Sequence, residues 1–590
     1  MFGKFGRIRA QRGMLALLAA STVLAGPAHA QDAAAPAPAA PAAATSDSAM
    51  VNLVRLLVEQ GVLKQDKGDA LLRQAETEAA AVRAGKPVEL AAPGAGTIRV
   101  PYIPETVRQQ IKDELRAEVL GQAKNEGWAW KEQAAPEWTK RVTISGDIRI
   151  RTQSDLFAKT NSDQIFDFAR INALGPFDVS GARPFPFLNT RIDKWNQLRL
   201  RARLGIEAHV NDKIKVGFQL ATGDDNSPIS TNSLLAGGFG KRDLWLQLGY
   251  LEAKPTNWST LTFGRMENPF NSSDLLFDHD VAFDGIAAQV DAGKFIGENI
   301  NLAIKGGVFP LDFGNPNNPS TANTKTKFAQ KYLLSGEVEV GAKIADNVDI
   351  KFSAGYHDFS NVQGQLSEPC LTAEGVTDCS TDGLRPFFLR KGNTLSYLRQ
   401  IATRNVPNPP LLQYFGLTFK YKILDFNASA SFPLTDDVTV GVRGNYVRNI
   451  AFNSSDICRN GVDGEPFNNG GTTGIATVPT ICGGGANASK FNGGNQGYLG
   501  AFSIGQKKIH KWGDWQFEAG YRRLESDAVL DSLTDSDFHL GGTNYKGYFI
   551  GGKIGLFEGT TLGARWMSAN EISGEPLGID VFQIDLEAKF

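Results

Sequence analysis

Apolar residues fall on every second position through most of this chain, and this alternation limits its fold more than any other feature. The clearest case is 198–210. Its apolar positions are Leu198, Leu200, Ala202, Leu204, Ile206, Ala208 and Val210, and the polar positions between them include Arg199, Arg201, Arg203, Glu207 and His209. Successive side chains of a β-strand point to opposite faces, so this pattern predicts a strand with one apolar and one polar face. After Asn211-Asp212 the alternation returns over 214–220, which predicts a hairpin.

The same alternation continues from about residue 139 to the end of the chain. Besides the hairpin, we expect strands at 141–151, 243–253, 258–266, 283–291, 299–309, 333–344, 347–358, 414–432, 437–448, 497–506, 514–524, 546–557, 560–568 and 579–590. About ten residues at about 3.3 Å each, tilted by about 40°, span about 25 Å. That span matches the apolar band of an outer-membrane barrel, so the lengths suit strands that cross such a membrane.

One segment leaves the number of strands open. In 414–432 the apolar residues stand at odd positions as far as Tyr421 and at even positions from Phe426. The segment is therefore either two strands with almost no turn or one long strand with a bulge near 423–425. One bulged strand gives sixteen strands and a strict alternation of short and long connections. Short periplasmic turns and long outer loops are usual in outer-membrane barrels, so we expect one strand here.

A sheet with an apolar outer face cannot keep an open edge in lipid, because each unpaired backbone group would cost several kcal/mol. We therefore expect an all-β transmembrane barrel of about sixteen antiparallel strands over residues 139–590. A barrel of this width has a lumen that the side chains of its wall cannot fill. A water-filled channel is the expected consequence.

The chain before the barrel divides into three parts. Basic residues, an apolar run over 14–24 and Ala28-His29-Ala30 predict a signal peptide at 1–30; a membrane anchor is the alternative, but the run is too short. Residues 31–46 are nearly all Ala and Pro, which predicts a linker. Helical spacing over 47–138 predicts a short α-helical periplasmic segment. It either self-associates as a small coiled coil or forms a helical hairpin packed on the barrel mouth.

Four cysteines lie in two of the predicted outer loops. Cys370 and Cys379 share one loop, and Cys458 and Cys482 share another. An exported protein meets an oxidising environment, so we expect disulfides within each loop, Cys370–Cys379 and Cys458–Cys482. Metal binding is the alternative, but neither loop holds a histidine at ligand spacing.

A group of arginines is the candidate basic lining of the channel. Its members are Arg149, Arg151, Arg199, Arg201 and Arg203, all on the polar faces of the first two expected strands. Adjacent strands would bring them together, and five like charges must face water or partners. In one interpretation they face the lumen. In the other they pair locally with Glu207, Asp147 or outer-loop carboxylates and stabilise the wall.

The segment between the fifth and sixth expected strands carries a family resemblance. It reads GRMENPF from residue 264 and DLLFDHD from residue 274. With the helical segment and Pro136-Glu137-Trp138, it resembles the proteobacterial putative porin family, relatives of the sixteen-stranded general porins. The alternating end of the chain, 581–590, is similar to the last strand of outer-membrane barrels, in which a closing aromatic such as Phe590 is the assembly signal. An ordinary terminal strand of a soluble sandwich is the alternative.

The resemblance implies a charged constriction. In general porins the third loop folds into the lumen and presents carboxylates to arginines on the opposite wall. The acidic side here would be Glu267, Asp274, Asp278 and Asp280, and the basic side the five arginines. Opposed rows of fixed charge would sort solutes by size, dipole and charge. The resemblance also implies a homotrimer in the outer membrane of a Gram-negative bacterium, in contact with its lipid and inserted by the barrel assembly machinery.

The expected function is that of a porin, passive diffusion of small hydrophilic solutes or ions, without catalysis, cofactor or metal. A barrel enzyme would need a nucleophile and a base. The histidines after the predicted signal peptide, His209, His279, His357, His510 and His539, are scattered without a Ser or Asp partner pattern. An energy-coupled receptor would need about 22 strands and a plug. With 61 Lys and Arg against 63 Asp and Glu, nothing favours nucleic acid. The remaining alternative is a barrel that anchors the helical segment as an envelope tether.

Overall fold

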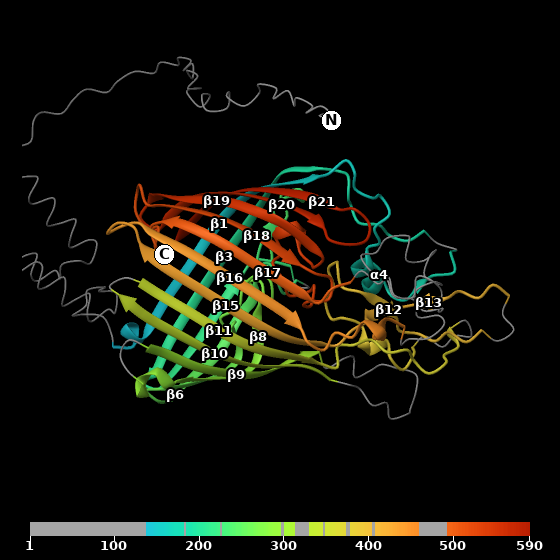
Figure 1. Cartoon of the computed structure of the whole chain (residues 1–590), viewed down its shortest axis with the longest axis horizontal. Helices are drawn as coiled ribbons and strands as arrows, with labels where there is room; N and C mark the ends of the chain where they lie inside the picture. The colour runs from blue at the N-terminus through green and yellow to red at the C-terminus, as the bar shows by residue number, and fades with distance from the viewer. Residues whose placement is uncertain are drawn as a thin grey trace, which may run out of the picture. The chain divides into compact units, whose positions relative to one another are not determined.

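The structure of the chain, a computed structural model, describes residues 137–181, 184–224, 227–296, 300–312, 330–345, 348–372, 378–403, 407–458 and 493–590. The predicted signal peptide, the linker and nearly all of the predicted helical segment lie outside these residues. So does Cys482 of the predicted Cys458–Cys482 disulfide. The described residues form a β-barrel whose longer connections gather at one end (Figure 1).

The barrel is one sheet of seventeen strands, of which β5 (Ser233–Leu234) is only two residues long. The other sixteen make the wall: β1 (Val142–Phe157), β3 (Lys194–Asn211), β4 (Ile214–Ala221), β6 (Trp245–Thr256), β7 (Ser259–Glu267), β8 (Ala282–Asp291), β9 (Ile300–Asp312), β10 (Lys331–Ala345), β11 (Val348–Ser360), β15 (Tyr421–Pro433), β16 (Thr439–Asn449), β17 (Gln496–Gly505), β18 (Trp515–Leu524), β19 (Tyr545–Phe557), β20 (Thr560–Glu571) and β21 (Gly578–Lys589). Each pairs antiparallel with its neighbours in this order.

The sheet closes where the last strand pairs with the first. The register between β21 and β1 runs from Phe157 opposite Ile579 to Asp147 opposite Lys589. Phe590 extends it, because its N–H donates to the carbonyl of Gly146 at 3.0 Å and its carbonyl accepts from the N–H of Gly146 at 3.1 Å. Closure leaves no sheet edge to be desolvated in lipid. The predicted antiparallel barrel of sixteen strands is confirmed.

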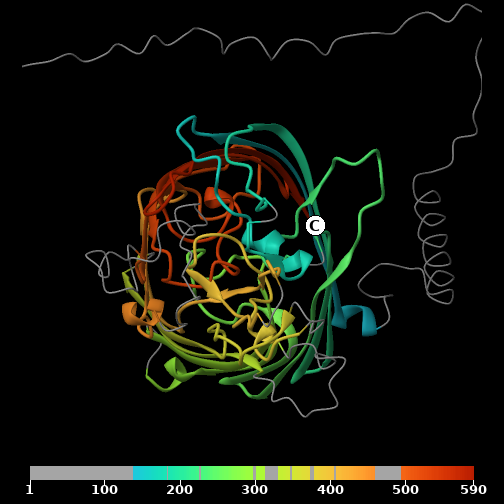
Figure 2. The same ribbon diagram turned by 90° about the vertical axis from the view of Figure 1, so that its right-hand side faces the viewer.

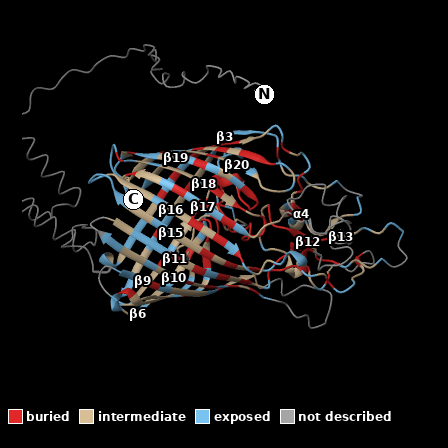
Figure 3. Cartoon of the chain, viewed as in Figure 1, coloured by how far each residue is buried: buried red, intermediate tan, exposed pale blue. Residues whose placement is uncertain are grey.

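The two faces of the wall differ as the alternation predicts. Figure 3 shows exposed and buried residues following one another along the strands. On β1, Ile148 and Ile150 are 49% and 42% exposed, whereas Arg149 between them is 8% exposed. Apolar side chains on the outside suit a lipid environment. Among the described residues, no helix is long and apolar enough to cross a membrane.

Short turns lie at one end of the barrel, where the C-terminus also lies (Figure 1). In the β3–β4 turn, the side-chain oxygen of Asn211 accepts hydrogen bonds from the N–H groups of Lys213 and Ile214, each at 2.9 Å, a local reason for the turn. We number the eight connections at the other end as loops 1 to 8. They are 158–193, 222–244, 268–281, 313–330, 361–420, 450–495, 525–544 and 572–577. Loop 8 is shorter than predicted, because β20 and β21 extend further than their apolar pattern.

The single bulged strand predicted over 414–432 is wrong. The wall strand β15 starts at Tyr421 and pairs with β11 and β16 without a register shift. The preceding β14 (Phe415–Leu417) belongs to loop 5, where it pairs with β12 (Leu395–Tyr397). Tyr421 and Ile423 point inward, and both are fully buried against the loops. The apolar residues therefore change from odd to even positions at the depth in the barrel where the loop core ends.

Loops fill the outer part of the barrel, as the view in Figure 2 shows, and their buried side chains form an apolar core there. Ile171 of α4 (Phe168–Leu174) in loop 1, Leu275 in loop 3, Phe415 in loop 5 and Val529 in loop 7 are all fully buried in this core. Packing of this kind holds the loops against one another and against the inner wall. The part of the lumen nearer the short turns is lined by the polar side chains of the strands.

Loop 5 is held by further connections. Its strand β13 (Leu412–Gln413) pairs with β2 (Phe177–Asp178) of loop 1. The predicted disulfide Cys370–Cys379 is confirmed, and it joins two parts of the loop with Cα atoms 5.9 Å apart. Buried Arg399 donates to both carboxylate oxygens of Asp382, at 2.8 and 2.5 Å. These bonds make loop 5 an ordered part of the mouth.

Candidate functional site: a charged constriction inside the barrel

The arginines predicted as the basic side lie together on the inner wall. In the register of β1 and β3, Arg149 stands opposite Arg201, and Arg151 stands opposite Arg199. Arg203 follows on β3, opposite Asp147. The alternation of the two strands turns all five arginines inward, and the antiparallel pairing brings them side by side.

Carboxylates of the same wall neutralise part of this group. Asp147 accepts from Arg201 Nε at 2.9 Å and from Arg203 Nε at 2.6 Å. Glu587 on β21 accepts from Arg201 at 2.5 Å. Local pairing with Asp147, the alternative considered from the sequence, therefore accounts for Arg201 and Arg203. Glu207 does not take part, because it accepts from Tyr250 and Lys215.

Arg151 is neutralised from both the wall and a loop. Its guanidinium donates to both oxygens of Asp585 on β21, at 2.7 and 2.9 Å, and to Asp537 of loop 7 at 2.6 Å. Arg149 has a neutral partner instead, the side-chain oxygen of Asn232 in loop 2, at 2.8 Å. The wall thus keeps an excess of positive charge around Arg149.

Loop 3 crosses the interior of the barrel. It leaves the wall between β7 and β8, yet the N–H of Asn271 donates to Glu337 on β10, and the hydroxyl of Ser273 donates to Asn445 on β16. Arg522 on β18 donates to Asp274 at 3.1 Å and to Asp535 of loop 7 at 2.5 Å. These contacts show that loop 3 runs into the barrel, as the resemblance implied.

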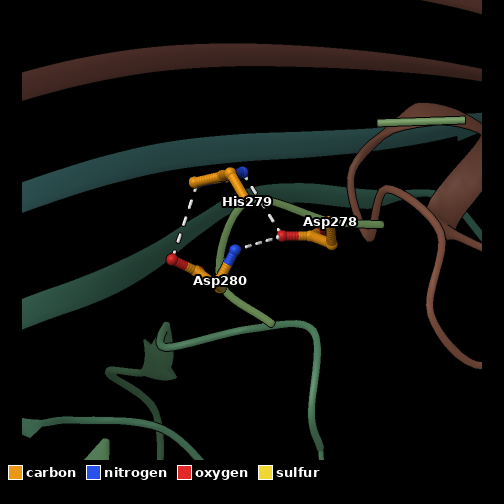
Figure 4. A group of neighbouring side chains, drawn as sticks. All are labelled: Asp278, His279 and Asp280. Carbon is orange, nitrogen blue, oxygen red and sulfur yellow. Dashed lines mark hydrogen bonds and ion pairs between the residues drawn. The ribbon is translucent and has the colours of Figure 1, made fainter. Parts of the chain in front are cut away.

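The end of loop 3 places three titratable residues in the lumen (Figure 4). Asp278 accepts from the N–H groups of Ser536 and Asp280, at 2.7 and 2.8 Å. Asp280 accepts from the N–H and the hydroxyl of Thr231, at 3.0 and 2.9 Å, and its other oxygen lies 3.8 Å from Arg203. The ring of His279 stands between the two carboxylates, 3.3 Å from Asp278 and 3.6 Å from Asp280. Both acids are buried, whereas the His279 side chain is 56% exposed.

Burial and neighbouring charges shift the acidity of these groups. Partial desolvation inside the barrel lowers the pKa of His279, but Asp280 and Asp278 raise it more, so the pKa lies above the usual histidine value. Burial raises the pKa of Asp278 to about 8, although His279 acts in the opposite direction. Burial would also raise the pKa of Asp280, but His279 and the hydrogen bonds from Thr231 outweigh it and keep this pKa low. The protonated imidazole therefore acts as a counter-ion to the ionised carboxylate of Asp280.

The same three residues carry metal-ligand atoms within 4.8 Å of one another. Each ring nitrogen of His279 already faces a carboxylate, and Arg203 lies beside Asp280. Cations therefore occupy the space around both acids. The arrangement is an ion-pair network, and we assign it no metal.

The predicted acidic side is only partly assembled. Asp280 reaches the arginines, and Asp278 lies next to it. Asp274 instead pairs with Arg522 and anchors the loop. Glu267, the last residue of β7, is exposed, whereas its neighbour Met266 is turned into the core. The acids near the arginines thus differ from the predicted set.

Sequence reasoning missed the carboxylates of loop 7 and of β21. Asp535 and Asp537 reach Arg522 and Arg151, and Asp585 and Glu587 line the last strand. Asp585 and Glu587 occupy the polar face of an alternating strand that must neighbour β1 in a closed barrel. That signal was present in the sequence. Loop 7 has no period that would place its acids.

The comparisons with solved structures find outer-membrane proteins at low similarity. A loop deletion mutant of OmpT, an outer-membrane protein of Vibrio cholerae, matches at 10% identity with a TM-score of 0.33, covering 76% of this chain and 100% of that one. The outer-membrane channel DcaP of Acinetobacter baumannii matches at 10% identity with a TM-score of 0.33, and the match covers 76% of this chain and 97% of that one. Salmonella typhi OmpF in complex with daunomycin matches at 7% identity with a TM-score of 0.36, and the match covers 76% of this chain and 97% of that one. The fold assignment rests on the strand pairing described above.

The amino-acid sequence supplies the family. No curated protein sequence matches this chain. The family described as putative porin matches residues 47–590, which include the segment predicted to be helical, the barrel and loop 3. Together with the closed barrel of sixteen strands, this match indicates a channel rather than an enzyme. The chain belongs to the putative porin family.

Proposed function

We propose that the protein is a diffusion channel of the outer membrane, through which small hydrophilic solutes or ions pass down their gradients. The observation that carries this proposal is the approach of Asp280, on a loop that crosses the barrel, to Arg203 on the wall. A loop that brings fixed charge into a lumen narrows the passage and leaves its polar surface to water. The apolar exterior of the wall supports placement in lipid.

The selectivity filter of this channel consists of Arg149, Arg201 and Arg203 on one side and Asp278 and Asp280 on the other. Arg149 has no carboxylate hydrogen-bond partner among the described residues, and His279 adds a positive charge when it is protonated. The filter therefore favours anions at neutral pH. Asp274 holds loop 3 in place through Arg522 and acts on transport only indirectly.

The surroundings of the channel follow from the same proposal. The short turns face the periplasm and the long loops face outward, as is usual for such barrels. The barrel assembly machinery would recognise the last strand together with Phe590, which follows it and is 70% exposed. Three copies would assemble, a proposal that rests on the resemblance to general porins. Analytical ultracentrifugation in detergent tests the trimer.

Liposome swelling tests the channel directly. Vesicles that contain the folded protein are diluted into iso-osmotic solutions of a neutral pentose, a disaccharide or a tetrasaccharide. Entry of the pentose should swell them fastest, and the rate should fall with solute size because loops 3 and 7 narrow the lumen. Vesicles with heat-denatured protein are the control. Equal rates with folded and denatured protein would contradict the proposal.

A further inference from the structure

A separate cavity of about 1160 Å³ lies at the mouth of the barrel, further out than the constriction. Loops 1, 2 and 5 form most of its lining, together with the outer ends of β1, β3 and β21. Six of its lining residues are basic and four are acidic. The basic residues are Arg170, Lys194, Arg199, Arg385, Arg390 and Lys391. The cavity therefore has a positive excess, and it lies where a solute would enter.

The guanidinium groups of two of these arginines donate no hydrogen bond to a described residue. The Nε atoms of Arg199 on β3 and Arg390 in loop 5 are both buried and bond to no acceptor among the described residues. The backbone N–H of Arg390 donates to Asp531 at 3.1 Å, but its guanidinium donates no hydrogen bond to a described residue. Unsatisfied buried donors are costly, so a guanidinium left in this state is poised to bind an acceptor.

The two guanidinium groups also act on each other. Burial lowers the pKa of Arg390, the negative charges of Asp531 and Asp278 raise it, and the positive charge of Arg199 makes a smaller contribution that lowers it. Two like charges in one cavity repel each other unless an anion comes between them. Arginine presents a planar fork of N–H donors that fits a carboxylate with two parallel hydrogen bonds.

Two of the four acids of the cavity do not fill this role. Asp167 caps α4 by accepting from the N–H of Arg170 at 3.0 Å. Asp312 pairs with Lys331 at 3.0 Å, outside the cavity lining. These two acidic side chains are committed elsewhere, and Arg199 and Arg390 remain for an incoming anion.

Apolar side chains line the rest of the cavity. Phe157, Leu188, Phe388 and Leu540 all line it and pack on the apolar core. The ring of Phe388 also lies 5.6 Å from the guanidinium carbon of Arg390. A small inorganic anion would leave this apolar surface in water. An organic anion with an apolar body would cover it, which contributes about 25 cal/mol for each Å² buried.

The wall that holds Arg390 is fixed before any ligand arrives. The Cys370–Cys379 disulfide ties the start of the lining segment 378–391. At its end, Lys391 donates to the carbonyl groups of His539 and Gly541, at 2.6 and 2.8 Å. A site held in this way loses little conformational entropy on binding.

We infer that this cavity is an entry site for organic carboxylates with a compact apolar body, with the carboxylate held between Arg199 and Arg390 and the body against Phe388 and Leu188. The inference names a substrate class for the proposed channel and so rests on that proposed function. From here the anion has a path inward, because Asn232 lines the cavity and also accepts the hydrogen bond of Arg149 in the constriction.

Isothermal titration of the folded, full-length protein in detergent with benzoate tests the site. Benzamide, acetate and inorganic phosphate are the comparison probes: benzamide lacks the charge, and acetate and phosphate lack the apolar body. Each should bind at least about tenfold more weakly than benzoate, since a charge-assisted hydrogen-bond pair and a buried ring are each worth about that factor. Phosphate that binds as tightly as benzoate would overturn the inference.

Variants locate the binding. Arg199→Gln and Arg390→Gln should each weaken benzoate at least about tenfold, and Phe388→Ala should weaken benzoate but not acetate. Arg242→Gln is the matched control, because Arg242 lies in loop 2 outside the cavity lining and is only partly buried. Unchanged benzoate affinity in Arg199→Gln, Arg390→Gln and Phe388→Ala, each with a folded barrel on unheated gels, would overturn the inference.

Conductance in KCl separates this inference from the channel itself. A protein that conducts KCl but does not bind benzoate would contradict the entry site and leave the channel standing. A protein that binds benzoate with the expected variant pattern supports the site, and its failure to conduct KCl would contradict the channel alone.

Discussion

Oδ1 of Asp280 in loop 3 lies 3.8 Å from Nη1 of Arg203 on β3. The two residues belong to different elements, because Arg203 lies on the wall strand β3 and Asp280 lies on the loop that joins β7 to β8. The contact therefore joins the inserted loop to the arginine group and marks the proposed constriction. Charge on either partner should act directly on permeating ions.

Replacement of Asp280 by asparagine should make the channel more selective for anions. The amide can keep a hydrogen bond from Thr231 while it loses the charge that faces Arg203. The reversal potential under a salt gradient measures the change. Asp284→Asn is the matched control, since Asp284 on β8 has a 57% exposed side chain and pairs with Arg265. Equal shifts in the two variants would contradict a special position for Asp280.

Loss of Arg522 should release two loops together. Arg522 is buried and holds Asp274 of loop 3 and Asp535 of loop 7, so Arg522→Met removes this cation from buried Asp535 and from partly exposed Asp274. We expect the free energy of unfolding to fall by about 3–5 kcal/mol and the channel current to become noisier. The temperature at which the barrel unfolds on gels measures the first effect.

Arg443→Met is the control for this loss. Arg443 on β16 pairs with Glu518 at 2.7 Å, and the two side chains are 39% and 37% exposed. Water screens such a pair, so its loss should cost less than about 1 kcal/mol. Identical unfolding temperatures for the two variants would show that Arg522 does not anchor the loops.

Selectivity should depend on pH through the end of loop 3. His279 has a pKa above its usual value of 6.5, so its ion pair with Asp280 stabilises the folded loop below pH 6.5 and is lost as the pH rises through the raised pKa. Asp278, with a pKa of about 8, loses its proton in the same direction. Both changes make the lumen more negative between about pH 6.5 and 9, and anion preference should decline there.

A double variant separates this effect from titration elsewhere. Asp278→Asn with His279→Gln removes both titrating groups and should keep a constant selectivity over that range. Reversal potentials at pH 6, 7, 8 and 9 give the comparison. A wild-type channel whose selectivity does not change, or a double variant that changes as much, would contradict the assignment.

The sequence was sufficient for the barrel wall and for the position of the arginines. Lipid outside and water inside impose a period of two, so the alternation around Ile148 and Leu204 identifies both the strands and their faces. Arg149 and Arg201 come together because neighbouring strands in an antiparallel barrel have a fixed register. Nothing beyond local pattern and closure was needed.

The loops could not be predicted in the same way. The contact between Asp280 and Arg203 depends on the path of loop 3 through space, which no periodicity encodes. The same limit explains why the single strand predicted over 414–432 is wrong. Phe415 and Tyr421 are buried in the apolar core that the loops form, and they do not face lipid. An apolar residue near the mouth of a barrel can face the lipid outside or the loop core inside, and sequence alone does not distinguish the two orientations.

The disulfide should matter for the mouth and not for the wall. Cys370→Ser with Cys379→Ser removes a link across nine residues. A disulfide that closes a loop of this size contributes about 2–3 kcal/mol to the free energy of unfolding that segment. The barrel should still fold and migrate as a compact species on unheated gels, while benzoate binding weakens. Reduction of the wild type should have the same effect. Failure of the barrel to fold, or unchanged benzoate binding, would contradict this role.

The most direct test of the account is single-channel recording of the purified protein in a planar bilayer, with the reversal potential measured under a KCl gradient for wild type and for Arg149→Gln. Arg149 bonds to neutral Asn232, so its loss leaves no carboxylate stranded. Lys254→Gln, at a 57% exposed side chain beside a turn, is the control. We predict ohmic steps with anion preference in wild type, weaker anion preference in Arg149→Gln and no change in Lys254→Gln. A folded barrel that passes no current, or an Arg149→Gln variant with wild-type selectivity, would contradict the charged channel.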